Sequence, residues 1–348
     1  MQQYLKIVGN GQRTMRDFTA DEAEAVMELV LSGQASDSQV AVLMAALRIK
    51  EESVSELATF TEVMRRYSQR LAEAPPHTVD ICVPYDGRSR TPILLAAAAF
   101  LAAACGAHIG LHGRIGQTTP PKFGVGVGDV LDALGIPVQH NLAEAGEMLA
   151  AYRIAFVDSA TFSSKLEGFL PVRLDYGMRS FFNTVEKLIN PFNAPAAIVG
   201  VFHYPVLARV AETAEKLGYA RAIVMQGPEG SIEALTSRRT PIVEFSSTTA
   251  LHEWTIDPRE MHIWEEAPAI VPPLTPSNQA DLTLQLLNPS ATTSTYERNS
   301  TLLTAALILY AADLADSIPA GIRLAEIART SGAAWELLAS LRKERQYA

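Results

Sequence analysis

Residues 170–191 read LPVRLDYGMRSFFNTVEKLINP, a segment that carries Arg173 and Arg179 into a run of apolar and aromatic residues ended by an Asn-Pro step. A guanidinium group is always charged and presents a fork of donors that suits a planar carboxylate or a phosphate. The segment therefore offers an anion site. The alternative is that both arginines form ion pairs within the chain, with residues such as Asp175 and Glu186.

The amino-acid composition limits the classes of protein to which the chain can belong. The chain has 348 residues, of which 48% are hydrophobic, so it is long enough for one large domain or two unequal ones. No apolar run lacks charges or turn formers over the length that a membrane span needs, and residues 1–6 have no apolar signal core. We therefore expect a soluble, cytoplasmic protein without a membrane partner.

The net charge of -9 argues against a protein coated in basic surface for nucleic acid. It leaves room for one basic groove on an acidic body.

The first seventy residues show three helix starts. Each fits the capping box, in which a hydroxyl and a side-chain oxygen satisfy amide donors reciprocally: Thr19-x-x-Glu22, Ser36-x-x-Gln39 and Ser53-x-x-Glu56. The second predicted helix is apolar nearly all round over residues 40–47, so it needs partners on more than one side. Those partners are either the rest of the chain or a second copy of it.

The pattern changes after residues 74–77, which read Ala-Pro-Pro-His and predict a linker. Short apolar runs then alternate with helix-length segments, which predicts crossover units around a mainly parallel sheet. The predicted strands are 79–83, 107–111, 154–157, 197–201, 222–226 and 242–245, with 252–256 as an edge strand. We expect crossover helices at 88–105 and 204–217 and further helices at 302–311, at 320–327 and through 341. The predicted fold class is α/β, with a small all-α domain in front.

The order of residues in 170–191 resembles a segment of the anthranilate phosphoribosyltransferases, in glycosyltransferase family 3. The shared pattern is Pro-Val-Arg, three residues, Gly-x-Arg-Ser-x-Phe-Asn and Leu-x-Asn-Pro. Further runs that match the family cover nearly the whole chain: 31–41, 46–57, 103–107, 112–113, 128–135, 315–317 and 331–338.

The resemblance implies a fold like that of nucleoside phosphorylases and phosphoribosyltransferases. It implies a helical N-terminal domain, residues 1–74, as the contact of a homodimer, and an α/β domain, residues 75–348, with 163–190 as the anion-binding segment between them. The family works in tryptophan biosynthesis. Its enzymes transfer a phosphoribosyl group from phosphoribosyl pyrophosphate to an aromatic amine, with magnesium on the pyrophosphate.

The resemblance also implies site residues. Those expected to bind the acceptor or its anion are His112, Gly113, Arg173 and Arg179. Those expected at the donor phosphates are Gly87, Arg88, Arg90, Arg114 and Lys122, and here the basic residues, which are this chain's own, would replace backbone contacts to phosphate that the family makes. Glu233 is either a metal contact or a solvated surface residue, and Mg²⁺ is expected only if the protein is catalytic.

The donor motifs of the family are altered in this chain. Its glycine-rich turn is replaced by Val83-Pro-Tyr-Asp-Gly-Arg88, and its Asn-x-Ser-Thr by residues 93–96, none of which has a side-chain donor. Its Asp-Glu pair retains only Glu233. In the loop 117–128, three glycines either hold an anion on their amides or only make a tight turn.

The matches to the family and the losses from its donor motifs leave three alternative functions. The first is pentosyl transfer from phosphoribosyl pyrophosphate to an aromatic acceptor, with the usual anthranilate activity in question because donor contacts are lost. The second is a non-catalytic paralogue that binds single-stranded nucleic acid in the interdomain cleft, as a divergent branch of the family is thought to do. The third is a dimeric scaffold that binds no ligand.

Overall fold

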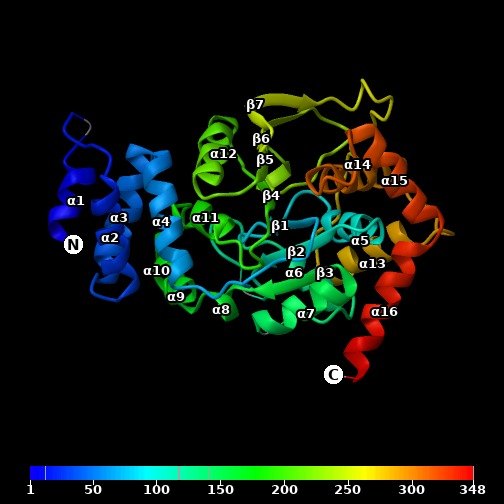
Figure 1. Ribbon diagram of the computed structural model, residues 1–348, viewed down its shortest axis with the longest axis horizontal. Coiled ribbons are helices and arrows are strands. Elements are labelled where there is room, and N and C mark those ends of the chain that lie inside the picture. Colours follow the sequence, from blue (N-terminus) through cyan, green and yellow to red (C-terminus); the bar gives the residue numbers. More distant parts are fainter. Residues whose placement is uncertain (12, 117, 140, 348) are drawn as a thin grey trace.

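The computed structural model describes residues 1–11, 13–116, 118–139 and 141–347, with the backbone alone from 343 onward. Residue 117 of the predicted glycine loop lies outside the described residues. Figure 1 shows a lobe of N-terminal helices on one side, a twisted sheet in the middle and the C-terminal helices on the far side.

Four helices open the chain: α1 (Gln2–Gly9), α2 (Ala20–Leu31), α3 (Asp37–Lys50) and α4 (Val54–Arg66). The three predicted capping boxes are confirmed, since Thr19, Ser36 and Ser53 each accept from the backbone amide three residues on, and that residue's side chain accepts in return. The starts of α2, α3 and α4 are therefore encoded locally.

A seven-stranded sheet follows, in the order β3-β2-β1-β4-β5-β6-β7. The first five strands in this order are parallel, and β6 and β7 are antiparallel. The mainly parallel sheet is confirmed, and each predicted strand overlaps an observed one. The bounds are β1 (Thr78–Cys82), β2 (His108–Gly113), β3 (Ile154–Asp158), β4 (Ala196–Gly200), β5 (Arg221–Met225), β6 (Thr240–Ser246) and β7 (Thr249–Ile256).

Helices and short turns connect these strands. The bounds are α5 (Leu95–Ala104), α6 (Val127–Ala133), α7 (Leu142–Tyr152), α8 (Ser159–Phe162), α9 (Ser164–Gly168), α10 (Leu170–Tyr176), α11 (Phe182–Val185), η1 (Glu186–Leu188), η2 (Tyr204–Val206), α12 (Leu207–Lys216), η3 (Pro228–Gly230), α13 (Pro276–Leu287), α14 (Thr295–Ala311), α15 (Ile318–Thr330) and α16 (Ala333–Tyr347). The predicted crossover helix at 88–105 is wrong at its start. The helix begins at Leu95, because residues 88–91 form a turn in which the amides of residues 89–91 donate to Glu229.

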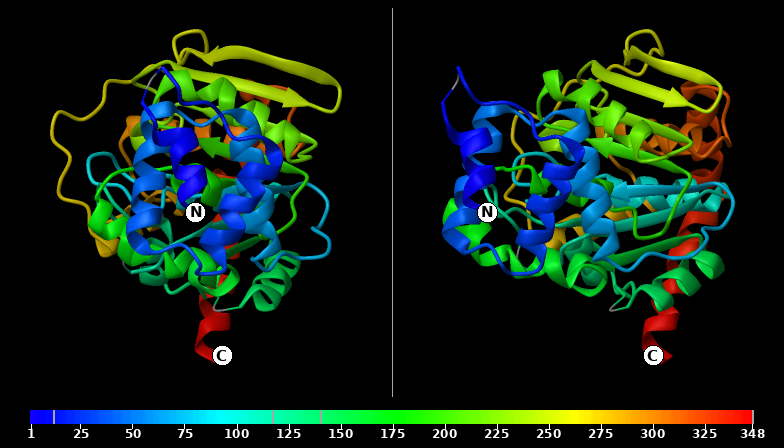
Figure 2. Two further views of the ribbon diagram at one scale, coloured as in Figure 1. Left: turned by 90° about the vertical axis from the view of Figure 1, so that its left-hand side faces the viewer. Right: turned by 60° about the vertical axis from the view of Figure 1, so that its left-hand side comes forward.

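The sheet is covered on both faces because alternate side chains of a strand point to opposite sides. One face packs against α5, α6 and α13 to α16 in a single apolar core that includes Val79 and Ile81 of β1. The opposite face packs against α12 over β4 to β6. Figure 2 shows the N-terminal helices standing beside the sheet rather than over it.

The segment after β3 belongs to the core of the helical lobe. Phe162, Phe181 and Phe182 lie in one buried cluster with side chains of α2, α3 and α4. Arg65 on α4 also donates to the backbone carbonyls of Leu188 and Leu217. The lobe is thus fastened to the larger domain by both apolar packing and hydrogen bonds.

Among the described residues, no helix combines the length and the apolar character needed to cross a bilayer.

Candidate active site in the interdomain cleft

A cavity of about 660 Å³ lies between the helical lobe and the carboxyl ends of the parallel strands. Arg48 of α3 lines one wall, and Tyr85, Phe202 and Glu229 line the other, from the loops after β1, β4 and β5. Strand order reverses between β1 and β4. In open α/β sheets such a reversal, at the carboxyl ends, is where ligands bind.

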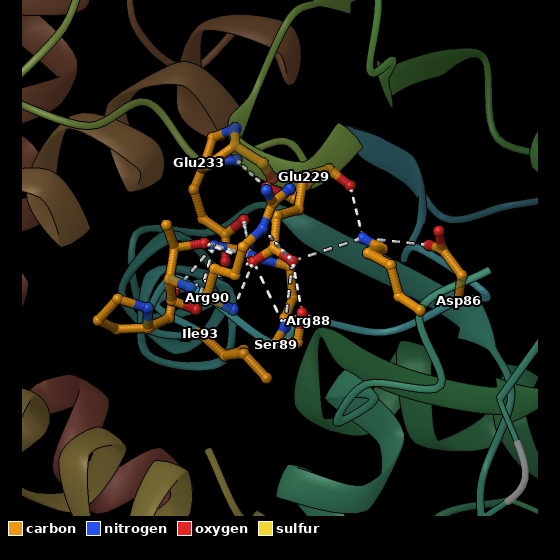
Figure 3. Close-up of polar contacts among 12 residues, drawn as sticks. Asp86, Arg88, Ser89, Arg90, Ile93, Glu229 and Glu233 are labelled. Atoms are coloured by element: carbon orange, nitrogen blue, oxygen red, sulfur yellow. Dashed lines mark hydrogen bonds and ion pairs between the residues drawn. The ribbon is translucent and has the colours of Figure 1, made fainter. Parts of the chain in front are cut away.

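The carboxylate of Glu229 is the most heavily bonded group of this cavity. It accepts from the backbone amides of Ser89 at 3.1 Å, Arg90 at 3.0 Å and Thr91 at 3.2 Å. The hydroxyls of Ser89 and Thr91 also donate to it, at 3.2 and 2.9 Å. Figure 3 shows these contacts gathered on one side chain.

Three cations surround the same carboxylate. The distances to its oxygens are 3.3 Å from Arg88 Nε, 3.7 Å from Arg90 Nε and 3.8 Å from Lys122 Nζ. Burial raises the pKa of Glu229, but Arg88, the Arg90 amide and Lys122 outweigh it and lower that pKa to about 2. Burial in turn lowers the pKa of Lys122 to about 8, against the pull of Asp86 and Glu229. The positive charges around the turn are therefore neutralised by carboxylates of the chain itself.

Glu233 is buried, with 1% of its surface exposed, so the alternative of a solvated surface residue is wrong. One oxygen contacts Arg88 Nη1, and the other accepts from the amides of Leu94 and Leu95 at 3.2 and 3.3 Å. The helix α5 thus begins on this carboxylate, since Leu94 offers no side-chain cap.

Gly87 is required by a close approach of two backbone segments. It has a φ of 67°, and a Cβ there would lie 2.3 Å from the carbonyl oxygen of Gly124. Arg88 beside it is 1% exposed. The structure therefore accounts for both residues by packing and pairing, and their assignment to a donor phosphate stays a prediction, as do those of Arg90 and Lys122.

Of the two alternatives for Arg173, the ion pair with Glu186 is present. Arg173 Nη1 lies 2.7 Å from Glu186 Oε2, and both side chains are buried. Burial raises the pKa of Glu186, although Arg173 opposes the shift. Arg179 pairs instead with Asp86, at 2.7 Å, and lines the cavity over the ring of Phe202.

His112 and Gly113 lie beneath the cavity wall. His112 is fully buried, with its Nε2 3.4 Å from Asp80 Oδ2 and its Nδ1 3.3 Å from the hydroxyl of Tyr85, which does line the cavity. A Cβ on Gly113 would meet a methyl group of Val83 at 2.3 Å. The anion-binding roles predicted for both residues remain predictions.

Arg114 lies one residue beyond β2. It pairs with Glu167 of α9, with Nη2 3.0 Å from Oε1. Its predicted phosphate role also remains a prediction.

Sequence reasoning missed three cationic residues that line the cavity: Arg48, Lys187 and Arg209. Lys187 Nζ donates to the carbonyls of Gly200 and Gly230, and burial lowers its pKa. Arg48 Nη1 donates to the carbonyl of Arg179 at 2.8 Å. The signal for Lys187 was a charged pair, Glu-Lys, inside an otherwise apolar run. Arg48 gave no signal beyond its place on a helix.

Metal-ligating groups do not converge in the described part of the chain, where no cluster of three or more His, Cys, Asp or Glu side chains could hold an ion.

Two family models match the sequence. Residues 78–335 match the model described as "Glycosyl transferase family, a/b domain". Residues 2–68 match the one described as "Glycosyl transferase family, helical bundle domain".

Individual proteins are similar over nearly the whole chain. An anthranilate phosphoribosyltransferase of Verminephrobacter eiseniae is 31% identical over 95% of this chain and 95% of its own. One of Rubrobacter xylanophilus is 32% identical over 90% and 89%. The crystal structure of the Thermus thermophilus enzyme superimposes with a TM-score of 0.84 at 28% identity, covering 99% of this chain and 100% of the other. A Saccharomyces cerevisiae structure, solved with PRPP and Mg, shares the fold with a TM-score of 0.83 at 17% identity, over 100% and 98%.

Proposed function

This chain belongs to the glycosyl transferase family that includes the anthranilate phosphoribosyltransferases, and on that premise we propose that it transfers a pentosyl group from phosphoribosyl pyrophosphate to an aromatic acceptor. This donor, abbreviated PRPP, is the compound with which the yeast enzyme was crystallised. Because the altered turn at residues 83–88 belongs to the family's donor motif, we name the acceptor only as an aromatic compound and do not extend the proposal to the usual anthranilate activity.

The cavity at the strand reversal is the observation that carries this proposal. Its volume of about 660 Å³ suits a phosphorylated sugar with a small aromatic partner, within the usual range of ligand sites. Tyr85 and Phe202 supply aromatic surface, while Arg48, Arg179 and Lys187 supply positive charge. A site of this kind combines an apolar wall with a few charged groups that fix the ligand's orientation.

The chain's own residues have distinct tasks in this proposal. Lys187 uses two donors on backbone carbonyls, so its third N–H is the one that can bind a ligand anion. Arg48 adds a second cation on the opposite wall. The carboxylate of Asp86 lines the cavity and favours positive charge developing on the sugar. Catalysis would then rest on orientation and electrostatics.

Magnesium fits poorly among the residues present. The carboxylates of Glu229 and Glu233 are already bonded to Arg88 and to backbone amides. A hard cation such as Mg²⁺ needs several oxygen ligands at once. The proposed transfer therefore relies on the chain's own residues. Magnesium binding is conditional on oxygens that a diphosphate ligand would bring.

Titration calorimetry with phosphoribosyl pyrophosphate and MgCl₂ tests donor binding, and chromatography of mixtures with anthranilate and other aromatic amines tests transfer. We expect saturable heat and a ribosylated product from at least one amine. No heat and no product across the panel would show that the proposal is wrong.

A cavity variant sharpens the test. Lys187→Met should weaken donor binding about tenfold or more, because a buried charge partner of the ligand is lost. The matched control is Arg323→Met on α15, an exposed cation away from the cavity, which should leave binding unchanged.

The nucleic-acid alternative gains no support from the comparisons. The five arginines expected at the acceptor and donor sites each lie within 4 Å of a carboxylate of the chain: Arg88, Arg90, Arg114, Arg173 and Arg179. Paired guanidinium groups release few counterions on binding a phosphate backbone.

A further inference from the structure

The turn at residues 88–91 has the geometry of an anion site. Three consecutive amides, from Ser89, Arg90 and Thr91, point at one place. Successive amides of this kind, with nearby cations, form the concave sites in which proteins hold phosphate. Here the place is filled by Glu229, a residue of η3 that lies about 140 positions later in the chain.

The donors outnumber what a carboxylate can accept. Six N–H or O–H groups converge on Glu229: Arg88 Nε, the amides of Ser89, Arg90 and Thr91, and the hydroxyls of Ser89 and Thr91. A carboxylate offers about four lone-pair positions. A phosphate group has more oxygens and more charge, so the donor set is better matched to phosphate than to its present occupant.

Glu229 is held in place at a conformational cost. Its φ of 55° and ψ of 21° lie in the left-handed region, which a residue with a side chain adopts only when its surroundings demand it. The segment is pinned by close approach, since a Cβ on Gly227 or Gly200 would meet the carbonyl oxygen of Ser231 at 2.0 or 2.3 Å. The backbone therefore presents this side chain to the turn.

The site is reachable from the cavity. Glu229 lines the cavity wall together with Asp86, and Lys122 bridges the two carboxylates at 3.8 and 3.3 Å. A ligand phosphate that enters the cavity therefore meets the outer side of the same donor cluster.

We propose that Glu229 is a built-in occupant of a phosphate site formed by residues 88–91, and that a ligand's phosphate group binds there by displacing it. The inference rests on the proposed function for the source of that phosphate. It goes beyond that function in assigning to Glu229 the role of an internal competitor. Binding to the unaltered protein is then weak, because the ligand must replace an anion that the chain itself supplies.

The test is calorimetry with inorganic phosphate and with pyrophosphate on the full chain, comparing wild type, Glu229→Ala and Glu229→Gln. We expect Glu229→Ala to bind either anion at least tenfold more tightly than wild type. Glu229→Gln, which keeps the side chain's volume, should gain less. The matched control is Glu244→Ala, which removes a buried carboxylate from Arg221 at the other end of the sheet and uncovers no amide turn; it should gain nothing.

Stability gives a second readout. The melting temperature of Glu229→Ala should fall without phosphate and recover when phosphate is added, whereas wild type and Glu244→Ala should show no such recovery. If Glu229→Ala does not fold, Glu229→Gln carries the comparison.

The inference is overturned if a folded Glu229 variant binds phosphate no more tightly than wild type. This result is separable from a failure of the proposed function. Suppose that a Glu229 variant binds phosphate more tightly than wild type while wild type forms no ribosylated product. That pair of results would support Glu229 as an internal competitor and would contradict only the proposed transfer activity.

Discussion

At the scale of single residues, the arginines in and around the cleft are paired with carboxylates of the same chain. Arg173 shows the consequence most clearly, because a residue expected to hold a ligand's anion instead holds Glu186. A buried charge is costly when its partner is removed, because it then stays buried without compensation. Glu186 occupies Nη1 of this guanidinium group, whereas Nη2 has no hydrogen-bond partner among the described residues.

Glu186→Ala should destabilise the protein by about 3–5 kcal/mol, because it leaves the Arg173 charge buried and uncompensated. Replacing both partners, as in Arg173→Met with Glu186→Leu, should cost clearly less than the single change. Urea unfolding followed by circular dichroism measures the difference. Equal losses in the single and double variants would mean that the pair does not act as a unit.

Glu229 predicts a specific response to acid. Its pKa lies at about 2 in the folded protein, below the ordinary value of 4.5, chiefly because Arg88 and the Arg90 amide outweigh the effect of burial. A lowered carboxyl pKa stabilises the fold above pH 4.5, and that contribution is lost as pH falls toward 2. The melting temperature of wild type should therefore exceed that of Glu229→Gln at pH 6 and approach it near pH 2.5. A gap that stays constant over this range would contradict the assigned shift.

At the scale of elements, the capping boxes show that local sequence sets the helix starts in the N-terminal lobe. Ser36 accepts from the amide of Gln39 at the start of α3, and Gln39 accepts in return. Ser36→Ala should therefore cost about 1 kcal/mol, while Ser36→Asp, which keeps an acceptor, should stay close to wild type. Thermal melts of the two variants decide this; an unchanged Ser36→Ala would show that packing alone holds the helix end.

Sequence patterns predicted most elements because their causes are local. Capping residues predicted α2, α3 and α4 of the N-terminal lobe, and short apolar runs predicted the strand positions. The start of α5 was not predictable in this way. The amides of residues 89–91 are satisfied by Glu229, and those of Leu94 and Leu95 by Glu233, about 140 positions away. No pattern within residues 88–105 records such partners.

At the scale of the whole molecule, the helical lobe and the larger domain form the two walls of one cavity. Arg65 ties α4 to the larger domain through the carbonyls of Leu188 and Leu217, and Arg209 of α12 pairs with Glu51 across the opening. The family resemblance predicted two lobes with a cleft between them. It did not predict which side chains join the lobes, because the partners, such as Glu51 and Arg209, lie far apart in the sequence.

The expected homodimer is a prediction that belongs to this scale. Val42 and Ile49 lie seven positions apart on α3, hence on one face of the helix, and are 51% and 69% exposed. An exposed apolar stripe on the outer side of a lobe favours contact with a second copy.

Light scattering after gel filtration should therefore give a dimer for wild type and a monomer for Val42→Asp combined with Ile49→Asp. Ile327→Asp on α15, 63% exposed at the opposite end, is the matched control and should remain dimeric. Because the cavity is built within one chain, the monomeric variant should still bind the ribose donor as wild type does. A wild type that is monomeric at all concentrations would show that α3 is not the contact.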